Sequence, residues 1–246
     1  MADPISLFVA LTFLLAGLVK GVIGLGLPTV AMGLLAVAMP PADAAALLIV
    51  PSLVTNVWQM LAGGHLARIA RRLWSMMLGV CVGTVAGGGL LTSASTHLAA
   101  AALGAALALY AALGLLSLRW TVRGGAERWL SPVIGAVTGL ITAATGVFVI
   151  PAVPYLQAIG LDKEELVQAL GLSFTVSTLA LAATLAHAQA FPAALAAASL
   201  LALLPAVLGM VAGQWARARL REDTFRRVFF AGLLALGAYL MLRALR

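Results

Sequence analysis

A lysine and several glycines lie inside an apolar stretch where an ordinary membrane helix carries neither. The segment Gly17-Leu-Val-Lys20-Gly21-Val-Ile-Gly24-Leu-Gly26-Leu-Pro28 lies in the middle of residues 5–39, which are otherwise almost entirely apolar. Glycine and proline break the helical hydrogen-bond ladder, and N–H groups freed in hydrocarbon cost several kcal/mol each unless protein or water binds them. A lysine at that depth costs roughly 2.5–3.5 kcal/mol. A broken helix that lines a polar cavity tolerates both, and such helices form the binding sites of many transporters.

The glycines and Pro28 suit a helix that restarts inside the membrane. Glycine lets a ligand approach the backbone, and proline is favoured in the first helical turn. A restarting helix presents unpaired N–H groups and the positive end of its dipole, which together favour anions. The second half has a counterpart at Thr145-Gly146, with Thr145 as the expected N-cap. We therefore interpret Gly24, Gly26, Thr145 and Gly146 as backbone positions of an anion site; the alternative is that the glycines only allow close helix crossing.

Lys20 has two interpretations that the sequence leaves open. It is the only lysine or arginine within an apolar stretch, so it can supply a full positive charge to the anion site. Alternatively, it lies at the tip of the broken segment and its long side chain extends to water at the membrane surface.

Amide and hydroxyl side chains on two other apolar segments are candidate ligand contacts. Asn56 and Gln59 are one helical turn apart and share a face. Thr175 and Thr178 occupy the matching places in the second half, with Gln168 nearby. Neutral amides and hydroxyls donate hydrogen bonds to small anions, although they also join membrane helices to one another.

The sequence contains no constellation typical of an enzyme. No His/Cys cluster has metal-ligand spacing, and no serine or cysteine nucleophile has partners in a known motif. Gly24-Leu-Gly26 does not follow a strand, and no P-loop is present, so a nucleotide site is excluded. We expect no enzyme activity, metal or cofactor, and any active transport must use ion gradients or an external partner.

Composition places the chain in the membrane class. It has 246 residues, of which 63% are hydrophobic and 9% charged, and its mean hydropathy of +1.10 lies far outside soluble norms. Apolar runs of about 20 residues, each enough to cross ~30 Å of hydrocarbon, fill most of it. The net charge of +7 comes from arginines in short loops, as in cytoplasmic anchors, rather than from a nucleic-acid surface. We expect an all-α polytopic membrane protein in contact with the lipid bilayer.

The apolar segments and their boundary signals predict two similar halves. Residues 5–39 are too long for one crossing and suit two short helices or a re-entrant pair, and residues 129–159 form the second broken stretch. Asp43 is an expected N-cap. Three membrane helices follow each broken stretch, over residues 44–61, 73–91, 98–118, 163–186, 192–215 and 228–242.

A shift of 118 residues places Gly17 on Gly135, and a shift of 119 places Asn56 on Thr175. The order of these matches, together with the placement of breaks and caps, indicates a duplication. The chain is then a single transmembrane domain (1–246), with repeat one over 1–118, a linker over 119–128 and repeat two over 129–246.

The positive charges decide between two topologies. If each broken stretch crosses once, the basic loops at residues 68–72 and 119–128 lie opposite the loop at 217–227, against the positive-inside rule. If each stretch goes in and comes back, all three loops and Lys163 lie on one side. The second arrangement makes the halves inverted repeats, with the basic loops cytoplasmic and both termini outside the cytoplasm. The start Met-Ala-Asp-Pro has no positive region, so we expect no cleaved signal peptide.

These segments resemble the sulfite exporter TauE/SafE family. Lys20-Gly21-Val-Ile-Gly24-Leu-Gly26-Leu-Pro28 and residues 40–59 look like its first repeat, although Leu27-Pro28 stand where that repeat often has a longer glycine run. Thr145-Gly-Val-Phe-Val-Ile-Pro151, Pro154-Tyr-Leu-Gln157 and Leu172-Ser-Phe-Thr175-Val-Ser-Thr178 are similar to its second repeat. The resemblance covers nearly the full length. It implies a bacterial inner-membrane permease that moves small sulfur-containing anions such as sulfite or organosulfonates. With the topology deduced from the positive charges, both termini are then periplasmic.

The sequence thus predicts a secondary transporter, in which Lys20 and two helix N-termini neutralise a small anion while one repeat rocks against the other. An inside-negative potential favours anion export by roughly 2.3 kcal/mol per charge per 100 mV. An anion channel and a non-transporting membrane anchor subunit are the alternatives. The last helix and the alanine-rich helix over residues 98–118 offer faces for a homodimer.

Overall fold

The structure, a computed structural model, describes residues 4–116, 121–122 and 124–245. All regular secondary structure in these residues is helical. In the described ranges, seven helical stretches are long and apolar enough to cross a membrane, which confirms an all-α polytopic membrane protein. The helices are α1 (Pro4–Ile23), α2 (Leu27–Ala38), α3 (Pro41–Leu61), α4 (Leu66–Ala86), α5 (Leu90–Ser93), α6 (Thr96–Leu116), α7 (Gly124–Thr145), α8 (Ala152–Ala158), α9 (Lys163–His187), α10 (Ala193–Arg217) and α11 (Glu222–Ala244).

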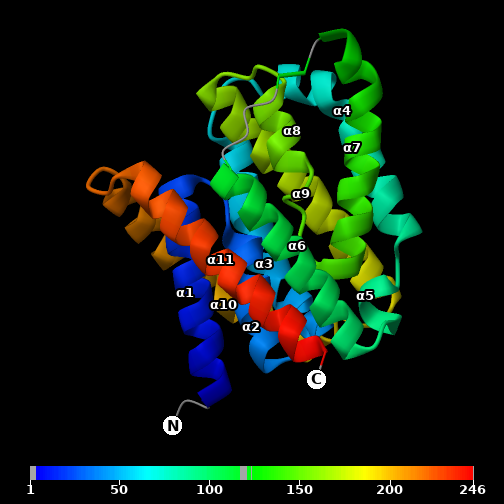
Figure 1. The fold of residues 1–246 in the computed structure, drawn as a ribbon, viewed down its shortest axis with the longest axis vertical. Coiled ribbons are helices and arrows are strands. Elements are labelled where there is room, and N and C mark those ends of the chain that lie inside the picture. Colours follow the sequence, from blue (N-terminus) through cyan, green and yellow to red (C-terminus); the bar gives the residue numbers. More distant parts are fainter. Residues whose placement is uncertain (1–3, 117–120, 123, 246) are drawn as a thin grey trace.

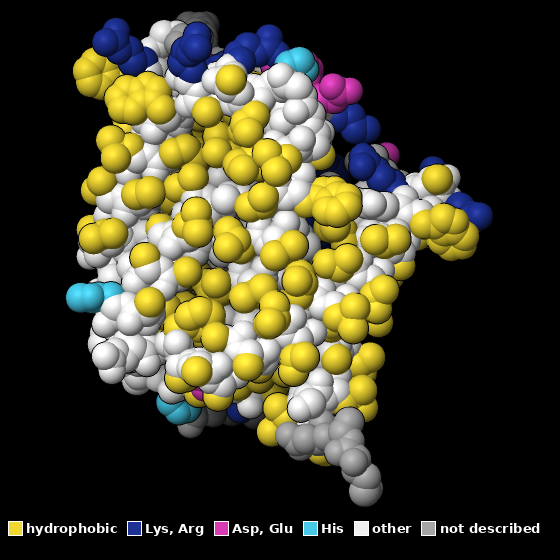
Figure 2. Space-filling model, turned by 180° about the vertical axis from the view of Figure 1, so that it is seen from behind, with side chains coloured by type: hydrophobic (Ala, Val, Ile, Leu, Met, Phe, Trp, Pro, Cys, Tyr) yellow, Lys and Arg dark blue, Asp and Glu magenta, His cyan; other side chains and the backbone are white. Residues whose placement is uncertain are grey.

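The long helices run between two ends of the molecule, and the chain starts and finishes at the same end (Figure 1). Lysine and arginine side chains gather at the other end, whereas hydrophobic side chains cover the body of the visible face (Figure 2). We call this other end the basic end. The starts of α4, α7 and α9 lie there, and the predicted Arg119 and Arg123 fall outside the described residues. The described basic residues on these starts are Arg68, Arg71, Arg72, Arg128 and Lys163.

The first predicted break is present. α1 ends at Ile23 and α2 begins at Leu27, with Pro28 in its first turn. Between them, Gly24 (φ +83°) and Gly26 (φ +109°) adopt left-handed backbone conformations that favour glycine. α1 is longer than the predicted short helix: its 20 residues suffice to cross a membrane, while the returning α2 has 12.

The second break differs from its prediction. α7 extends to Thr145, Gly146 (φ +70°) ends it, and α8 starts only at Ala152 and has 7 residues. Thr145 is therefore not the N-cap of a restarting helix. Its hydroxyl donates to the Ile141 carbonyl at 2.7 Å and accepts from the Val147 N–H at 3.2 Å. A threonine hydroxyl can donate to a carbonyl of the preceding helical turn, or it can accept from an N–H at the start of the next helix. The sequence does not distinguish these two roles, so the predicted N-cap was wrong.

Three other predicted helix starts need correction. α3 starts at Pro41, so Asp43 lies inside the first turn and is no N-cap. α4 and α11 begin at Leu66 and Glu222, several residues before the predicted starts. The arginine-rich segments form first helical turns instead of loops, because long basic side chains can extend along a helix to water.

The most extensive helix contacts join the two halves of the chain. α1 packs on α10, α4 on α7, α6 on α11 and α3 on α9. Glycines make the first two contacts close. A Cβ on Gly17 would lie 2.1 Å from the Ala206 carbonyl oxygen, and a Cβ on Gly135 would lie 2.1 Å from that of Met76. The two glycines that the 118-residue shift superimposes thus pack alike, and helix backbones touch where a side chain has no room.

Alanine substitution at Gly17 or Gly135 tests this close backbone packing. The added Cβ collides with backbone rather than with a flexible side chain, so we expect the free energy of unfolding to fall by about 1–3 kcal/mol. Gly232→Ala is the matched control, because a Cβ there meets no atom within 4 Å and alanine favours a helix. The free energy of unfolding in detergent is measured for all three variants. Equal changes at the three positions would contradict close backbone packing at Gly17 and Gly135.

Candidate functional site

Lys20 is enclosed by protein at the contact of α1 with α3. Its side chain belongs to a residue only 4% exposed, and its ammonium donates to Oδ1 of Asn56, which is fully buried. The side chain therefore does not extend to water at the surface, and the second of the two sequence interpretations is wrong. The site contains a cation inside the fold.

Asn56 connects Lys20 to a small polar cluster. Its Nδ2 donates to the hydroxyl of Ser52 at 3.0 Å and to that of Thr178 on α9 at 3.5 Å. The two hydroxyl oxygens are 3.2 Å apart. We call Lys20, Ser52, Asn56 and Thr178 the Lys20 cluster. Its members come from both halves of the chain, and Ser52, absent from the sequence candidates, was detectable one turn before Asn56 on the same face of α3.

The charge of the Lys20 cluster is not balanced. The three ion pairs within the described residues join His65 to Glu164, Arg68 to Glu165 and Arg72 to Glu127, all near the basic end. Lys20 contacts the neutral Asn56 instead of a carboxylate. A buried charge without a counter-charge is expensive, and in a membrane segment it marks a functional site.

Gln59 and Gly24 lie one turn closer to the basic end. Nε2 of Gln59 donates to the Gly24 carbonyl at 3.0 Å and to the Val167 carbonyl at 3.2 Å. The opposite amide atom, Oε1, is buried without a hydrogen-bond partner in the described structure. A Cβ on Gly24 would meet no atom within 4 Å, so space adjoins the break. Gln59 therefore links the α1–α2 break to α9 above the Lys20 cluster.

The other predicted site residues lie outside the cluster. Gln168 donates to the Met60 carbonyl at 2.9 Å and accepts from the His65 N–H at 2.8 Å, so it binds both sides of the α3–α4 turn. Thr175 donates to the Gly171 carbonyl within its own helix. Gly26 packs against Val19, and Gly146 packs against the side chain of Met32.

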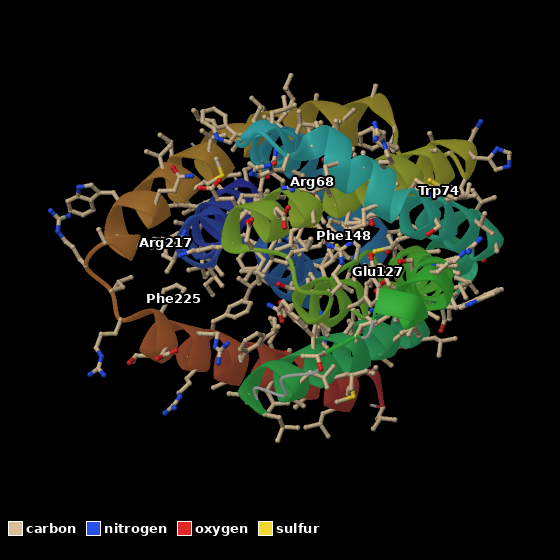
Figure 3. All side chains as sticks on the ribbon, turned by 90° about the horizontal axis from the view of Figure 1, so that it is seen from above. Arg68, Trp74, Glu127, Phe148, Arg217 and Phe225 are labelled. Carbon is tan, nitrogen blue, oxygen red and sulfur yellow. The ribbon has the colours of Figure 1, made fainter. Side chains whose placement is uncertain are left out.

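The sequence candidates omitted the non-helical segment 147–150. These four residues are at most 3% exposed. Phe148 lies near the centre of the helices seen from the basic end (Figure 3) and packs against Phe174 with 5.3 Å between ring centroids. Non-helical backbone at membrane depth is tolerated only inside protein or beside water. The β-branched run between Gly146 and Pro151 is typical of an extended segment and was the available signal. Ser173 and Ser177 add buried hydroxyls that lack a partner in the described structure.

One family comparison covers both the buried lysine and the broken helix. Residues 9–240 match the description "Sulfite exporter TauE/SafE". The chain belongs to the sulfite exporter TauE/SafE family. No curated protein and no solved structure matches the chain.

Membership in the TauE/SafE family has direct consequences. The matched range contains the whole Lys20 cluster and both breaks. The chain is thus a multi-pass membrane transporter for sulfite-type anions, and the family consists of transporters rather than enzymes. In the part of the chain that the structure describes, no three His, Cys, Asp or Glu side chains come together to hold a metal.

Gln168→Ala tests the structural role of this residue in the TauE/SafE fold. The substitution leaves the Met60 carbonyl and the His65 N–H without their partner, so we expect the free energy of unfolding to fall by about 1–3 kcal/mol. Gln157→Ala is the control, because Gln157 is exposed. Thermal unfolding with and without sulfite separates stability from binding. Loss of the sulfite-induced shift with an unchanged melting temperature would instead make Gln168 a ligand.

Proposed function

We propose that this chain is a secondary transporter that binds a small sulfur-containing anion, sulfite or an organosulfonate, at the Lys20 cluster. One observation carries the proposal: a buried ammonium bonds to a neutral amide at the contact of three helices. An anion entering the cluster supplies the missing negative charge. Desolvation then strengthens the attraction, because an electrostatic contact in protein is worth more than in water.

The donors around Lys20 match the oxygens of a sulfur oxyanion. The ammonium has three N–H donors, and the Asn56 amide adds two more. The Ser52 hydroxyl lies within hydrogen-bond distance of that amide, whereas the Thr178 hydroxyl accepts from the amide and donates to the Phe174 carbonyl at 2.7 Å. When the anion binds, Lys20 exchanges the Asn56 oxygen for an anion oxygen. Gly24 and Gly26 leave the start of α2 close to this site, where its dipole adds positive potential.

The closed cluster favours a carrier over a channel. Lys20, Asn56 and Thr178 are each at most 4% exposed, whereas a channel needs a continuous wet path. Gln59 closes the side toward the basic end by joining the Gly24 carbonyl to that of Val167. Breaking these two hydrogen bonds opens the cluster on that side, which is one half of an alternating-access cycle.

The glycine contacts favour moving units that differ from the two repeats. Rocking one whole repeat against the other would separate α1 from α10 and α4 from α7, where backbones touch. We propose that α1 with α10 and α4 with α7 move as two units. The α3–α9 contact between them carries the Lys20 cluster. Each unit then contains helices from both repeats.

Three structural features support the remaining parts of the proposal. The helix pairs α1–α10 and α4–α7, each of which joins a helix from one half to a helix from the other, support two inverted repeats in a single transmembrane domain. The gathering of basic residues at one end supports a cytoplasmic basic end and periplasmic termini in a bacterial inner membrane (Figure 2). With that orientation the membrane potential drives export of the anion. α11 exposes Val228, Tyr239 and Leu242, which leaves an apolar face for a homodimer.

Lys20→Met tests the proposal, because methionine keeps the length and removes the charge. We expect at least a tenfold loss of sulfite affinity, with a melting temperature that stays the same or rises once the buried charge is gone. Lys163→Met is the control, since Lys163 is exposed on the basic end. The measurements are a thermal-shift screen with sulfite, sulfate, thiosulfate, taurine, isethionate and sulfoacetate, and flux into proteoliposomes.

The same measurements separate the alternatives. Saturable flux with counterflow supports a carrier, and unsaturating high conductance would make the protein a channel. A purified protein that no anion stabilises, and whose function survives Lys20→Met, would be a non-transporting anchor subunit.

Asn56→Asp provides a second test with the shape of the cluster retained. A carboxylate beside Lys20 would balance its charge and compete with the anion, so we expect sulfite binding to weaken at least tenfold while the fold remains intact. Restored binding in the Lys20→Met/Asn56→Asp double variant would contradict this explanation. Competition experiments at constant ionic strength measure the affinities.

A further inference from the structure

A groove of about 800 Å³ lies between α4 and α7, and no residue of the Lys20 cluster lines it. Trp74, Leu78 and Val82 of α4 line one wall, and each is more than half exposed. Pro132 of α7 lies on the other side. Trp74 and Glu127, which lie on the two helices, are on the side of the molecule away from Arg217 (Figure 3). Because the wall residues belong to a stretch long enough to span a membrane, the groove faces the bilayer rather than water.

The groove changes from apolar to basic at the basic end. Arg72 and Arg128 belong to its lining. Arg71 lies one turn before Trp74 and Ser75 on the same face of α4. A smaller pocket, lined by Arg68, Arg71 and Arg72, shares Arg72 with the groove. Basic side chains at the interface above an apolar groove match an amphipathic ligand whose head is anionic.

The positive charge at this end exceeds the negative charge. Glu127, the acidic residue of the lining, accepts two hydrogen bonds of 2.7 Å from Arg72, which neutralises it. None of the ion pairs in the described residues uses Arg71 or Arg128. α4 and α7 also both begin at this end, so their positive dipole ends lie together.

We infer that this groove binds one anionic phospholipid. The headgroup phosphate lies against Arg71 and Arg128, and an acyl chain follows Trp74, Leu78 and Val82. Basic pockets between membrane helices bind anionic headgroups, whereas a zwitterionic lipid brings no net charge to the two arginines. The bound lipid would contact α4 and α7, and hence both halves of the chain, without touching the Lys20 cluster.

Lipid titration of the purified full-length chain tests this site. Delipidated protein in detergent is titrated with phosphatidylglycerol and with phosphatidylcholine of the same acyl chains, and bound lipids are counted by native mass spectrometry. We expect tighter binding of phosphatidylglycerol. Arg71→Ala/Arg128→Ala should lose about 30-fold in phosphatidylglycerol affinity, the factor that corresponds to about 2 kcal/mol for two interfacial arginines. Arg221→Ala/Arg227→Ala, which removes two exposed arginines from the start of α11, should retain it.

Leu78→Trp keeps every charge and fills the apolar half of the groove, so it should weaken phosphatidylglycerol binding as well. Cooperative thermal unfolding should persist in all these variants, which shows that each one is folded and keeps the test independent of the anion site. Several results would overturn the inference: equal affinity for the two lipids, equal losses in both double-arginine variants, no effect of Leu78→Trp, or glycerol phosphate binding as tightly as the lipid. A second copy of the chain occupying the groove would appear as a dimer that lipid does not displace.

Discussion

The hydrogen bond between the Lys20 ammonium and Asn56 is the interaction on which the arrangement around it depends. A lysine charge tolerated within a bilayer needs protein or water around it, and here protein provides the enclosure. α1 supplies the cation, α3 supplies Asn56 and Ser52, and α9 supplies Thr178. The break after α1 belongs to the same arrangement, since its Gly24 carbonyl is bound by Gln59 from α3. Without this enclosure neither the lysine nor the broken helix would be stable at that depth.

Glycine-mediated contacts make the enclosure possible and also limit how it can open. Gly17 and Gly135 bring helices of opposite halves into backbone contact. Such contacts gain dispersion energy over many atoms and lose it quickly when the helices separate. The α3–α9 contact is also close, since a Cβ on Gly171 would lie 2.4 Å from the Met60 nitrogen. It adds hydroxyl and amide hydrogen bonds, which an anion can replace under the proposed function. The Lys20 cluster therefore combines close backbone packing with exchangeable hydrogen bonds.

The sequence predicted the features that arise from local chemistry. Gly24, Gly26 and Pro28 located the first break because glycine φ freedom and proline pre-organisation act within one turn. The start of α9, predicted at residue 163, is stabilised by a capping box in which the Asp162 and Glu165 side chains each accept from the other's backbone N–H. The features it missed depend on contacts between distant segments. Gln168 looked like a ligand donor because nothing in its own helix reveals that the α3–α4 turn lies against it. The hydroxyl of Thr145 was misassigned because the same sequence signal serves a helix end and a helix start.

The two breaks also differ in chemistry. Lys20 lies four residues before Gly24, and Thr142 lies four residues before Gly146. The N–H of each glycine donates to the carbonyl of the residue four before it, at 2.7 and 2.8 Å. The backbone hydrogen bond that ends the helix at a glycine is therefore the same in both halves. Only the first half has a lysine at this position. The second half has the neutral Thr142, whose hydroxyl donates to the Thr138 carbonyl. A site with one buried cation balances one negative charge, so under the proposed function it suits a monoanion, such as an organosulfonate, better than a dianion whose second charge would stay uncompensated in a medium of low dielectric constant.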